Sequence, residues 1–317
     1  MTKRSANPSG RLVIGTRGSP LAVAQSTMIA DAIRACHPNL TVSLARITTG
    51  GDLSQGIDRP ISAVGTKGLF TAELESALAD GAIDLAVHSS KDLPTALADG
   101  TDLLAWPIRG DPRDALVIGP EALAPGSLAS LPGGAVVGTS SLRRAGQLLA
   151  LRPDLKVEPI RGNVQTRIEK VRSGAFAATL LAVAGLRRLS LLHEAAEVMD
   201  VRQIVPAAGQ GALALQGRCD DARVRELLAP LHHEPTARAV TAERHVVARL
   251  AGGCNMPLGV YVRQHGGGRL EGIAALVGPT GRPRVTATAV ADDPTVVAEG
   301  LVEQLLAAGG SALLGAD

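Results

Sequence analysis

The chain has 317 residues, of which 45% are hydrophobic and 20% charged, so it can bury a large core and is not intrinsically disordered. Its formal net charge is only +2 and its aromatic content is 1%. These values argue against a strongly basic surface and against stacking platforms for bases, so we expect no nucleic-acid partner.

The first third of the chain alternates predicted strands with predicted helices. A polar segment rich in glycine interrupts this series at residues 49–67, where a functional lid and an ordinary surface loop are equally compatible with the composition. A polar stretch that begins at His88 follows the last of these strands. The predicted strands are 11–16, 40–48 and 83–87, and the predicted helices are 19–36, beginning with Ser19 and Pro20, and 71–79, with Thr71 as cap.

A second series follows Asp111-Pro112. Strands are predicted at 135–138, 155–160 and 176–182, with helices that begin near Leu142, after Asn163 and at Val183. Such alternation favours parallel, doubly wound sheets with right-handed crossovers, and therefore two α/β units. Residues 206–217 could return the chain to the first unit. The last segment has a different pattern, with helices at 236–250 and 294–308 around three short strands at 260–262, 269–276 and 284–291. It predicts a small α+β domain.

Between Thr139 and Arg188 the chain carries ten Lys or Arg residues and three Asp or Glu residues. Several of the arginines stand where a predicted strand passes into a helix, as Arg143 and Arg144 do after Thr139-Ser140-Ser141. Helix N-termini and guanidinium groups both favour anions, and arginine matches carboxylates in a bidentate way. A solvated basic face is the alternative for any single arginine, but two such junctions in succession favour a site for a small polycarboxylate.

Two further positions could carry chemistry. Asp92 follows the strand at 83–87, where open α/β sheets bind ligands, and it could stabilise a developing cation or serve only as a turn residue. His88 is more typical of a structural histidine. Cys254 lies between Gly252-Gly253 and Pro257, on a predicted loop that something could reach, although an isolated cysteine is more often an inert core residue.

The three cysteines, Cys36, Cys219 and Cys254, show neither metal-ligand spacing nor a disulfide framework. The N-terminal residues lack the apolar region of a signal peptide, and no apolar run reaches the roughly 20 residues of a membrane span. We therefore expect a cytoplasmic protein without a metal and without a membrane partner, in which Cys36 and Cys219 stay unmodified.

The chain closely resembles the porphobilinogen deaminase family, also called hydroxymethylbilane synthases. The resemblance covers nearly the whole chain and rests on motifs in the family's order: GTRGSPLAVAQ (15–25), GTKGLFTAELE (65–75), DLAVHSSKDLPT (84–95), DPRDA (111–115), VGTSSLRRAGQL (137–148), IRGNVQTRI (160–168), LAVAGLRRL (181–189), PAAGQGAL (206–213) and TAERHVVARLAGGCNMPLG (241–259).

The resemblance implies a transferase of porphyrin and heme biosynthesis, which joins four porphobilinogen molecules into a linear tetrapyrrole and releases four ammonias. It implies a dipyrromethane cofactor held by a thioether on Cys254, and a monomer. Asp92 matches the aspartate that contacts pyrrole N–H groups and stabilises the cationic intermediate. Positions implied around the cofactor are Lys67, Asp92, Thr139, Ser140, Ser141, Arg143, Arg144, Arg161 and Gly162, and those implied around the substrate are Arg17, Ser19, Phe70, Arg161, Arg167 and Arg188.

The implied architecture is two domains built like type II periplasmic binding proteins and a small C-terminal domain. We expect domain 1 to comprise residues 1–108 and about 212–230, domain 2 residues 109–211, and domain 3 residues 231–317. At two positions where the family often has an acidic residue, this chain has Gln216 and Ala251 instead. The rival interpretation is a non-catalytic two-lobed protein that binds a small polycarboxylate, which would need neither Cys254 nor a third domain.

Overall fold

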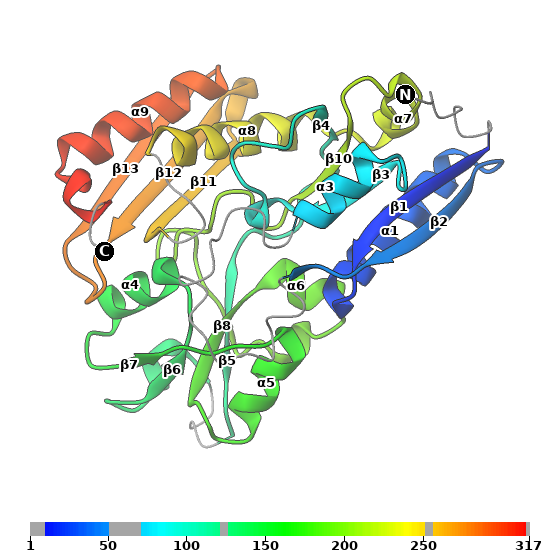
Figure 1. Ribbon diagram of the computed structural model, residues 1–317. Coiled ribbons are helices and arrows are strands. Elements are labelled where there is room, and N and C mark those ends of the chain that lie inside the picture. The colour runs from blue at the N-terminus through cyan, green and yellow to red at the C-terminus, as the bar shows by residue number, and fades with distance from the viewer. Residues whose placement is uncertain (1–9, 51–70, 121–125, 251–255, 315–317) are drawn as a thin grey trace. The chain divides into compact units, whose positions relative to one another are not determined.

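The computed structural model describes residues 10–50, 71–120, 126–250 and 256–314. The chain forms two compact units, whose helices and strands are labelled in Figure 1. The first comprises residues 1–88, 96–108 and 213–233, and the second comprises residues 89–95, 109–212 and 234–317. The second unit contains two of the three sheets, so the domain boundaries expected from the sequence stay a prediction.

The first unit is built around a five-stranded mixed sheet of order β2-β1-β3-β10-β4. Strand β1 is parallel to β2 and β3, whereas β10 and β4 are antiparallel to each other. The chain therefore returns to this sheet at β10, as the sequence suggested. Its elements are β1 (Arg11–Arg17), α1 (Pro20–Cys36), β2 (Thr41–Ile47), α3 (Ala72–Ala79), β3 (Leu85–Ser89), β4 (Thr101–Ala105), β10 (Leu213–Arg218) and α7 (Ala222–Leu228).

Local signals explain where these elements begin. The Ser19 hydroxyl accepts a hydrogen bond from the Ala22 N–H, and Pro20 occupies the first helical position of α1, as predicted. Thr71 precedes α3 but makes no capping hydrogen bond with its side chain. The acidic residues of the first turn of α3 bind other backbone segments instead, because Glu73 accepts from Gly50 N–H at 2.7 Å and Glu75 from Ala98 N–H at 3.4 Å.

The second unit contains a sheet of similar order, β7-β6-β8-β5-β9. Strand β6 is parallel to β7 and β8, but β5 is antiparallel to both β8 and β9, so both α/β sheets are mixed rather than wholly parallel. The elements are β5 (Asp114–Ile118), β6 (Val136–Gly138), α4 (Leu142–Leu151), β7 (Lys156–Glu158), α5 (Val164–Arg172), β8 (Ala178–Ala182), α6 (Val183–Arg188) and β9 (Glu197–Val198).

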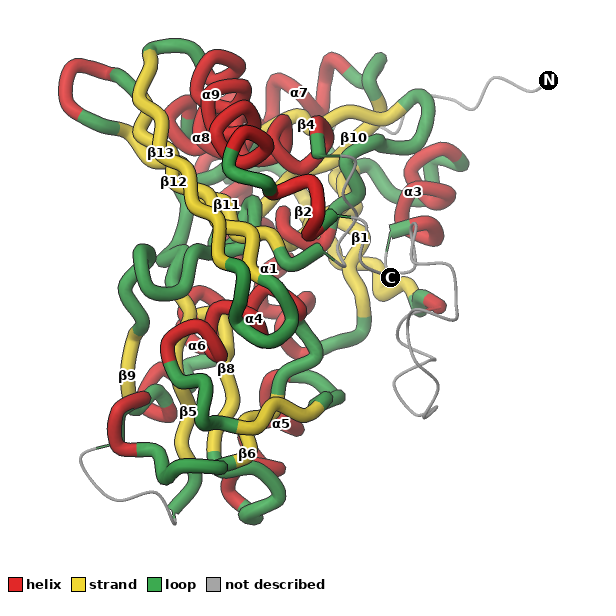
Figure 2. Tube along the Cα trace, turned by 90° about the vertical axis from the view of Figure 1, so that its left-hand side faces the viewer, coloured by secondary structure: helices red, strands yellow, loops and turns green. Residues whose placement is uncertain are grey.

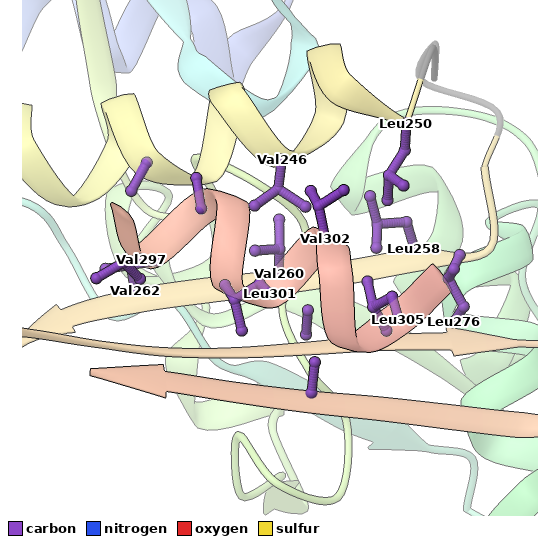
Figure 3. Close-up of a cluster of buried hydrophobic side chains, with 14 of the residues drawn as sticks. Val246, Leu250, Leu258, Val260, Val262, Leu276, Val297, Leu301, Val302 and Leu305 are labelled. Carbon is purple, nitrogen blue, oxygen red and sulfur yellow. The ribbon is translucent and has the colours of Figure 1, made fainter. Parts of the chain in front are cut away.

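The third sheet is antiparallel, of order β11-β12-β13, and its strands lie side by side in Figure 2. Helices α8 and α9 pack their apolar side chains against it, as Figure 3 shows for Val246, Val260 and Leu301. This aliphatic core confirms the small α+β domain predicted from the sequence. The elements are α8 (Glu234–Arg249), β11 (Leu258–Gln264), β12 (Leu270–Val277), β13 (Arg284–Ala291) and α9 (Pro294–Ala307).

Candidate active site

The candidate site in the second unit lies at one edge of the β7-β6-β8-β5-β9 sheet. Because β6, β7 and β8 are parallel, their carboxyl ends meet at this edge. Strand β5 runs the other way, so its first residue, Asp114, pairs with Ala182, the last residue of β8. The sheet topology therefore brings an aspartate to the edge where the arginine-bearing helices begin.

Asp114 is fully buried and binds both arginines of the first turn of α4. Its Oδ2 accepts from Arg143 Nη1 at 2.7 Å, and its Oδ1 accepts from Arg144 Nη2 at 2.6 Å. Burial alone would raise the pKa of Asp114, but Arg143 and Arg144 overcome this effect and hold it far below its usual range. The predicted cation pair is thus partly neutralised by a carboxylate that sequence reasoning did not assign to the site.

The three hydroxyl residues before α4 shape this junction. Ser141 caps the helix, since its Oγ accepts from the Arg144 N–H, and Thr139 Oγ1 accepts from the Ser141 N–H at 3.2 Å. Ser140 Oγ donates to the Ile160 carbonyl at 2.9 Å, which ties the junction to the end of the β7 segment. These bonds tie the N-terminus of α4 to the residue that precedes Arg161, and a helix N-terminus favours an anion.

The next two arginines of the predicted set are half-buried and meet backbone carbonyls. Arg167 Nε donates to the Gly162 carbonyl at 2.9 Å, and Arg188 Nη2 donates to the Gly211 carbonyl at 2.7 Å. Burial lowers the pKa of each arginine to about 10, and Arg144 adds to the effect at Arg167. Among the described residues, neither has a carboxylate within ion-pair distance. Such guanidinium groups are suited to the carboxylates of a ligand.

Gly162 has a left-handed backbone conformation, with φ of 107°. A Cβ atom at this position would approach the Thr166 side chain to 2.6 Å, so a glycine is required between Arg161 and the Asn163 cap of α5. The glycine therefore sets the turn that places both flanking polar residues.

Asp92 lies at the end of a short 3-10 turn, Ser90–Asp92, and its side chain is exposed. Its neighbour Lys91 places Nζ 3.5 Å from Gln210 Oε1, and Gln210 in turn donates from Nε2 to Asp114 Oδ1 at 3.1 Å. Removal from water lowers the pKa of Lys91 to about 8, with a further lowering by Arg144 and an opposing effect of Asp92. Asp92 and the arginines Arg143, Arg144, Arg161, Arg167 and Arg188 thus belong to one compact unit.

Three residues of interest belong to the first unit. Arg17 ends β1, and Ser19 caps α1, as described above. His88 is buried near the end of β3, and burial lowers its pKa to about 4, with an opposing effect of Gln216 and a further lowering by Arg17. A histidine that stays neutral at neutral pH agrees with the structural role suggested by the sequence.

Some predicted positions lie outside the described residues, namely Lys67, Phe70, Cys254, Ala251 and most of the 49–67 segment. Cys36 and Cys219 are described, and both are exposed free thiols. Gln216 is buried, and its side-chain amide donates to Glu75 Oε1 at 3.1 Å and to Thr101 Oγ1 at 2.8 Å. Both acceptors belong to the first unit.

In the described parts of the chain, no helix is long and apolar enough to cross a membrane, and no cluster of His, Cys, Asp and Glu could hold a metal ion. What the second unit offers instead is a set of buried and half-buried guanidinium groups, an ammonium group, helix N-termini and the exposed carboxylate of Asp92. This set fits the acetate and propionate groups of a dipyrromethane, with a carboxylate left to face positive charge.

Fold and site together define an α/β protein with a cluster of arginines at the strand ends of a mixed sheet. Two family models cover the chain: "Porphobilinogen deaminase, dipyromethane cofactor binding domain" matches residues 12–226, and "Porphobilinogen deaminase, C-terminal domain" matches residues 237–307. The chain belongs to the porphobilinogen deaminase family and is a transferase with a dipyrromethane cofactor.

Curated relatives agree along nearly the full length. A porphobilinogen deaminase of Roseiflexus castenholzii is 48% identical over 305 residues, covering 96% of this chain and 98% of the relative. A porphobilinogen deaminase of Ralstonia nicotianae is 46% identical, covering 99% of this chain and 94% of the relative. Among solved structures, the substrate-binding domain of a molybdenum ABC transporter from Clostridium difficile aligns with a TM-score of 0.43 at 13% identity, covering 71% of this chain and 93% of that one.

Proposed function

We propose that this chain condenses four porphobilinogen molecules head to tail into the linear tetrapyrrole hydroxymethylbilane, with release of four ammonias. The observation that carries the proposal is the half-buried pair Arg167 and Arg188, neither of which has a carboxylate within ion-pair distance among the described residues. Burying a cation is costly unless an anion accompanies it, so these arginines favour a ligand rich in carboxylates. Each pyrrole unit carries two carboxylates, and the growing product is therefore an increasing polyanion.

We assign the cofactor to Cys254 through a thioether, on the resemblance of its Gly-Gly-Cys motif. When bound, the dipyrromethane supplies the primer to which pyrrole units are added. The residues that would hold it are Thr139, Ser140, Ser141, Arg143, Arg144, Arg161 and Gly162, together with Lys67. The hydrogen bonds of Ser141 and Asp114 fix the first turn of α4, so this part of the site is preorganised for carboxylates.

We assign to Asp92 the stabilisation of the positive charge that develops during condensation. In each condensation the C–N bond of porphobilinogen breaks, ammonia leaves, a C–C bond forms to a pyrrole α-carbon, and that carbon loses its proton. Loss of ammonia leaves positive charge on the pyrrole, and a carboxylate placed beside it lowers the energy of that cation. Asp92 is exposed and belongs to the same compact unit as the arginines.

A direct experiment uses the purified full-length chain and porphobilinogen. We expect consumption of porphobilinogen, release of one ammonia for each molecule consumed, and a visible chromogen with a pyrrole-specific aldehyde reagent before substrate is added. Intact mass should exceed the sequence mass in the wild type and in Cys36→Ala, and should equal it in Cys254→Ala. A fully active protein with an unmodified Cys254 would exclude the assignment.

We further propose a cytoplasmic monomer that binds no nucleic acid. The near-neutral charge and the scarcity of aromatic residues support the absence of nucleic-acid binding, and the monomer and the location follow from the resemblance. Analytical ultracentrifugation of the cofactor-loaded protein tests the monomer, which should sediment near its sequence mass of 32.4 kDa.

A further inference from the structure

The loop that carries Asp92 is fixed at its start by backbone contacts. Ser90 N–H donates to the Ala212 carbonyl at 3.0 Å, and Leu93 N–H donates to the Ser90 carbonyl at 3.2 Å. Gly209 lies against this turn with φ of 71°, and a Cβ atom there would come within 2.2 Å of Ser90 Oγ. The first half of the loop is therefore tightly packed.

The second half of the loop is held by an arginine from a distant part of the sequence. Arg244 Nη2 donates to the Pro94 carbonyl at 2.8 Å and to the Thr95 carbonyl at 3.1 Å. Hydrogen bonds from a charged donor are stronger than neutral ones, so one side chain clamps two consecutive peptide groups. These two carbonyls follow Asp92 by two and three residues.

Arg244 projects from a well-anchored part of α8. The preceding residue, Glu243, is fully buried and accepts hydrogen bonds from Gly209 N–H at 2.6 Å and from Val262 N–H at 2.7 Å. Arg109 completes the anchor with Nη1 at 2.6 Å from Glu243 Oε1. Arg244 is thus fixed by the same contacts that hold the Gly209 turn against Ser90.

Chain connectivity alone would attach the Asp92 loop to the first unit, because β3 leads directly into it. The contacts place residues 89–95 in the second unit instead, with Arg143, Arg144 and Arg167. Asp92 also acts electrostatically on Arg167. The clamp from α8 is one of the contacts that keep this loop with the arginines.

We propose that Arg244 is a positioning residue for the condensation, which fixes the Asp92 carboxylate relative to the arginines by holding the carbonyls of Pro94 and Thr95. This inference rests on the proposed function, because it gives Arg244 a part in that reaction. Arg244 contacts this loop through backbone carbonyls, so we expect its loss to move the Asp92 carboxylate. A misplacement of about 1 Å can cost on the order of 10²-fold in rate.

The test compares three variants of the full chain. Arg244→Met keeps the apolar stem and removes the donors, whereas Arg244→Gln keeps an amide that can donate to one of the carbonyls. Arg238→Met is the matched control, since Arg238 lies on the same helix and also binds two backbone carbonyls, those of Gly268 and Asp292. The measurements are kcat and KM of cofactor-loaded protein, and hydrogen exchange of the peptide that spans Ser90 to Ala96.

We expect Arg244→Met to lower kcat by about tenfold or more, with KM within about twofold of wild type, and to speed exchange at the Leu93 amide. Arg244→Gln should recover part of both, and Arg238→Met should match wild type in both. Unchanged exchange in Arg244→Met, an unchanged kcat, or equal losses in Arg238→Met would overturn the proposal. If the wild type fails to consume porphobilinogen, the proposed function fails, while the exchange comparison still decides whether Arg244 fixes the loop.

Discussion

Asp114 holds Arg144 through a single carboxylate oxygen, with Oδ1 accepting from Nη2 at 2.6 Å and from Nε at 3.0 Å. The second oxygen is left for Arg143 Nη1 at 2.7 Å. Two guanidinium charges against one carboxylate charge leave one positive charge on this buried cluster. Asp114 therefore stabilises the two buried arginines in the folded state, and the remaining positive charge can attract an anionic ligand.

The first prediction concerns this counter-ion. Asp114→Asn keeps the shape of the side chain but leaves Arg143 and Arg144 buried without an anion, which typically costs about 3–5 kcal/mol when a buried pair is broken. We expect a fall of that size in the free energy of unfolding, measured with urea at neutral pH. The control is Asp154→Asn, which breaks a half-exposed pair with Arg152 and should change the midpoint far less. Similar losses in both variants would contradict the assignment of Asp114.

The second prediction separates function from stability at Arg167. Burial and Arg144 disfavour its charged form more than Asp92 favours it, so Arg167→Met should leave the melting temperature unchanged or raise it. Activity should nevertheless fall, because losing one partner of a buried charge pair with the ligand costs about 2–5 kcal/mol of binding. Arg172→Met on the same helix, which breaks only an ion pair with Glu194, is the control for activity. A lowered melting temperature in Arg167→Met with unchanged kinetics would show that the arginine is structural.

The third prediction follows from His88. Burial lowers its pKa to about 4 in the folded protein, whereas a histidine in an unfolded chain titrates near about 6.5. Between these values the unfolded chain binds a proton that the folded chain does not, so stability falls as the pH falls through this window. The loss from this group should reach about 2 kcal/mol between pH 7 and pH 5.

The measurement is urea unfolding of wild type and His88→Asn at both pH values. The variant should lose less stability than wild type on acidification, whatever its stability at pH 7. Equal losses in the two proteins would mean that His88 is already able to accept a proton in the folded state.

Periodicity and capping residues predict most of the helices and strands, because both are local features of the sequence. Ser19, Asn163 and Asp293 each cap the helix that follows them, and a cap needs only its own neighbours. The strands β4, β5 and β9 were not predicted. Each has five residues or fewer, and β5 follows directly on the charged segment around Arg113, so little periodicity marks them.

Site residues could be predicted from the sequence only where a local pattern marks them. The arginines at helix starts were identified because strand-to-helix junctions favour anions. Asp114 was missed as their counter-ion, since its position depends on the antiparallel pairing of β5 with β8, a long-range contact that has no local signal.

The central claim is that Asp92 stabilises a cation on the pyrrole during condensation, and the most direct test is kcat for Asp92→Asn and Asp92→Glu after each is shown to carry the cofactor. Asn keeps the size but removes the charge, so its kcat should fall by about 10²–10³-fold, the usual cost of losing one preorganised electrostatic group. Glu keeps the charge and moves it by one methylene, so it should retain more activity than Asn, and both should still bind porphobilinogen through the arginines. An Asn variant as fast as wild type, or faster than the Glu variant, would contradict the account.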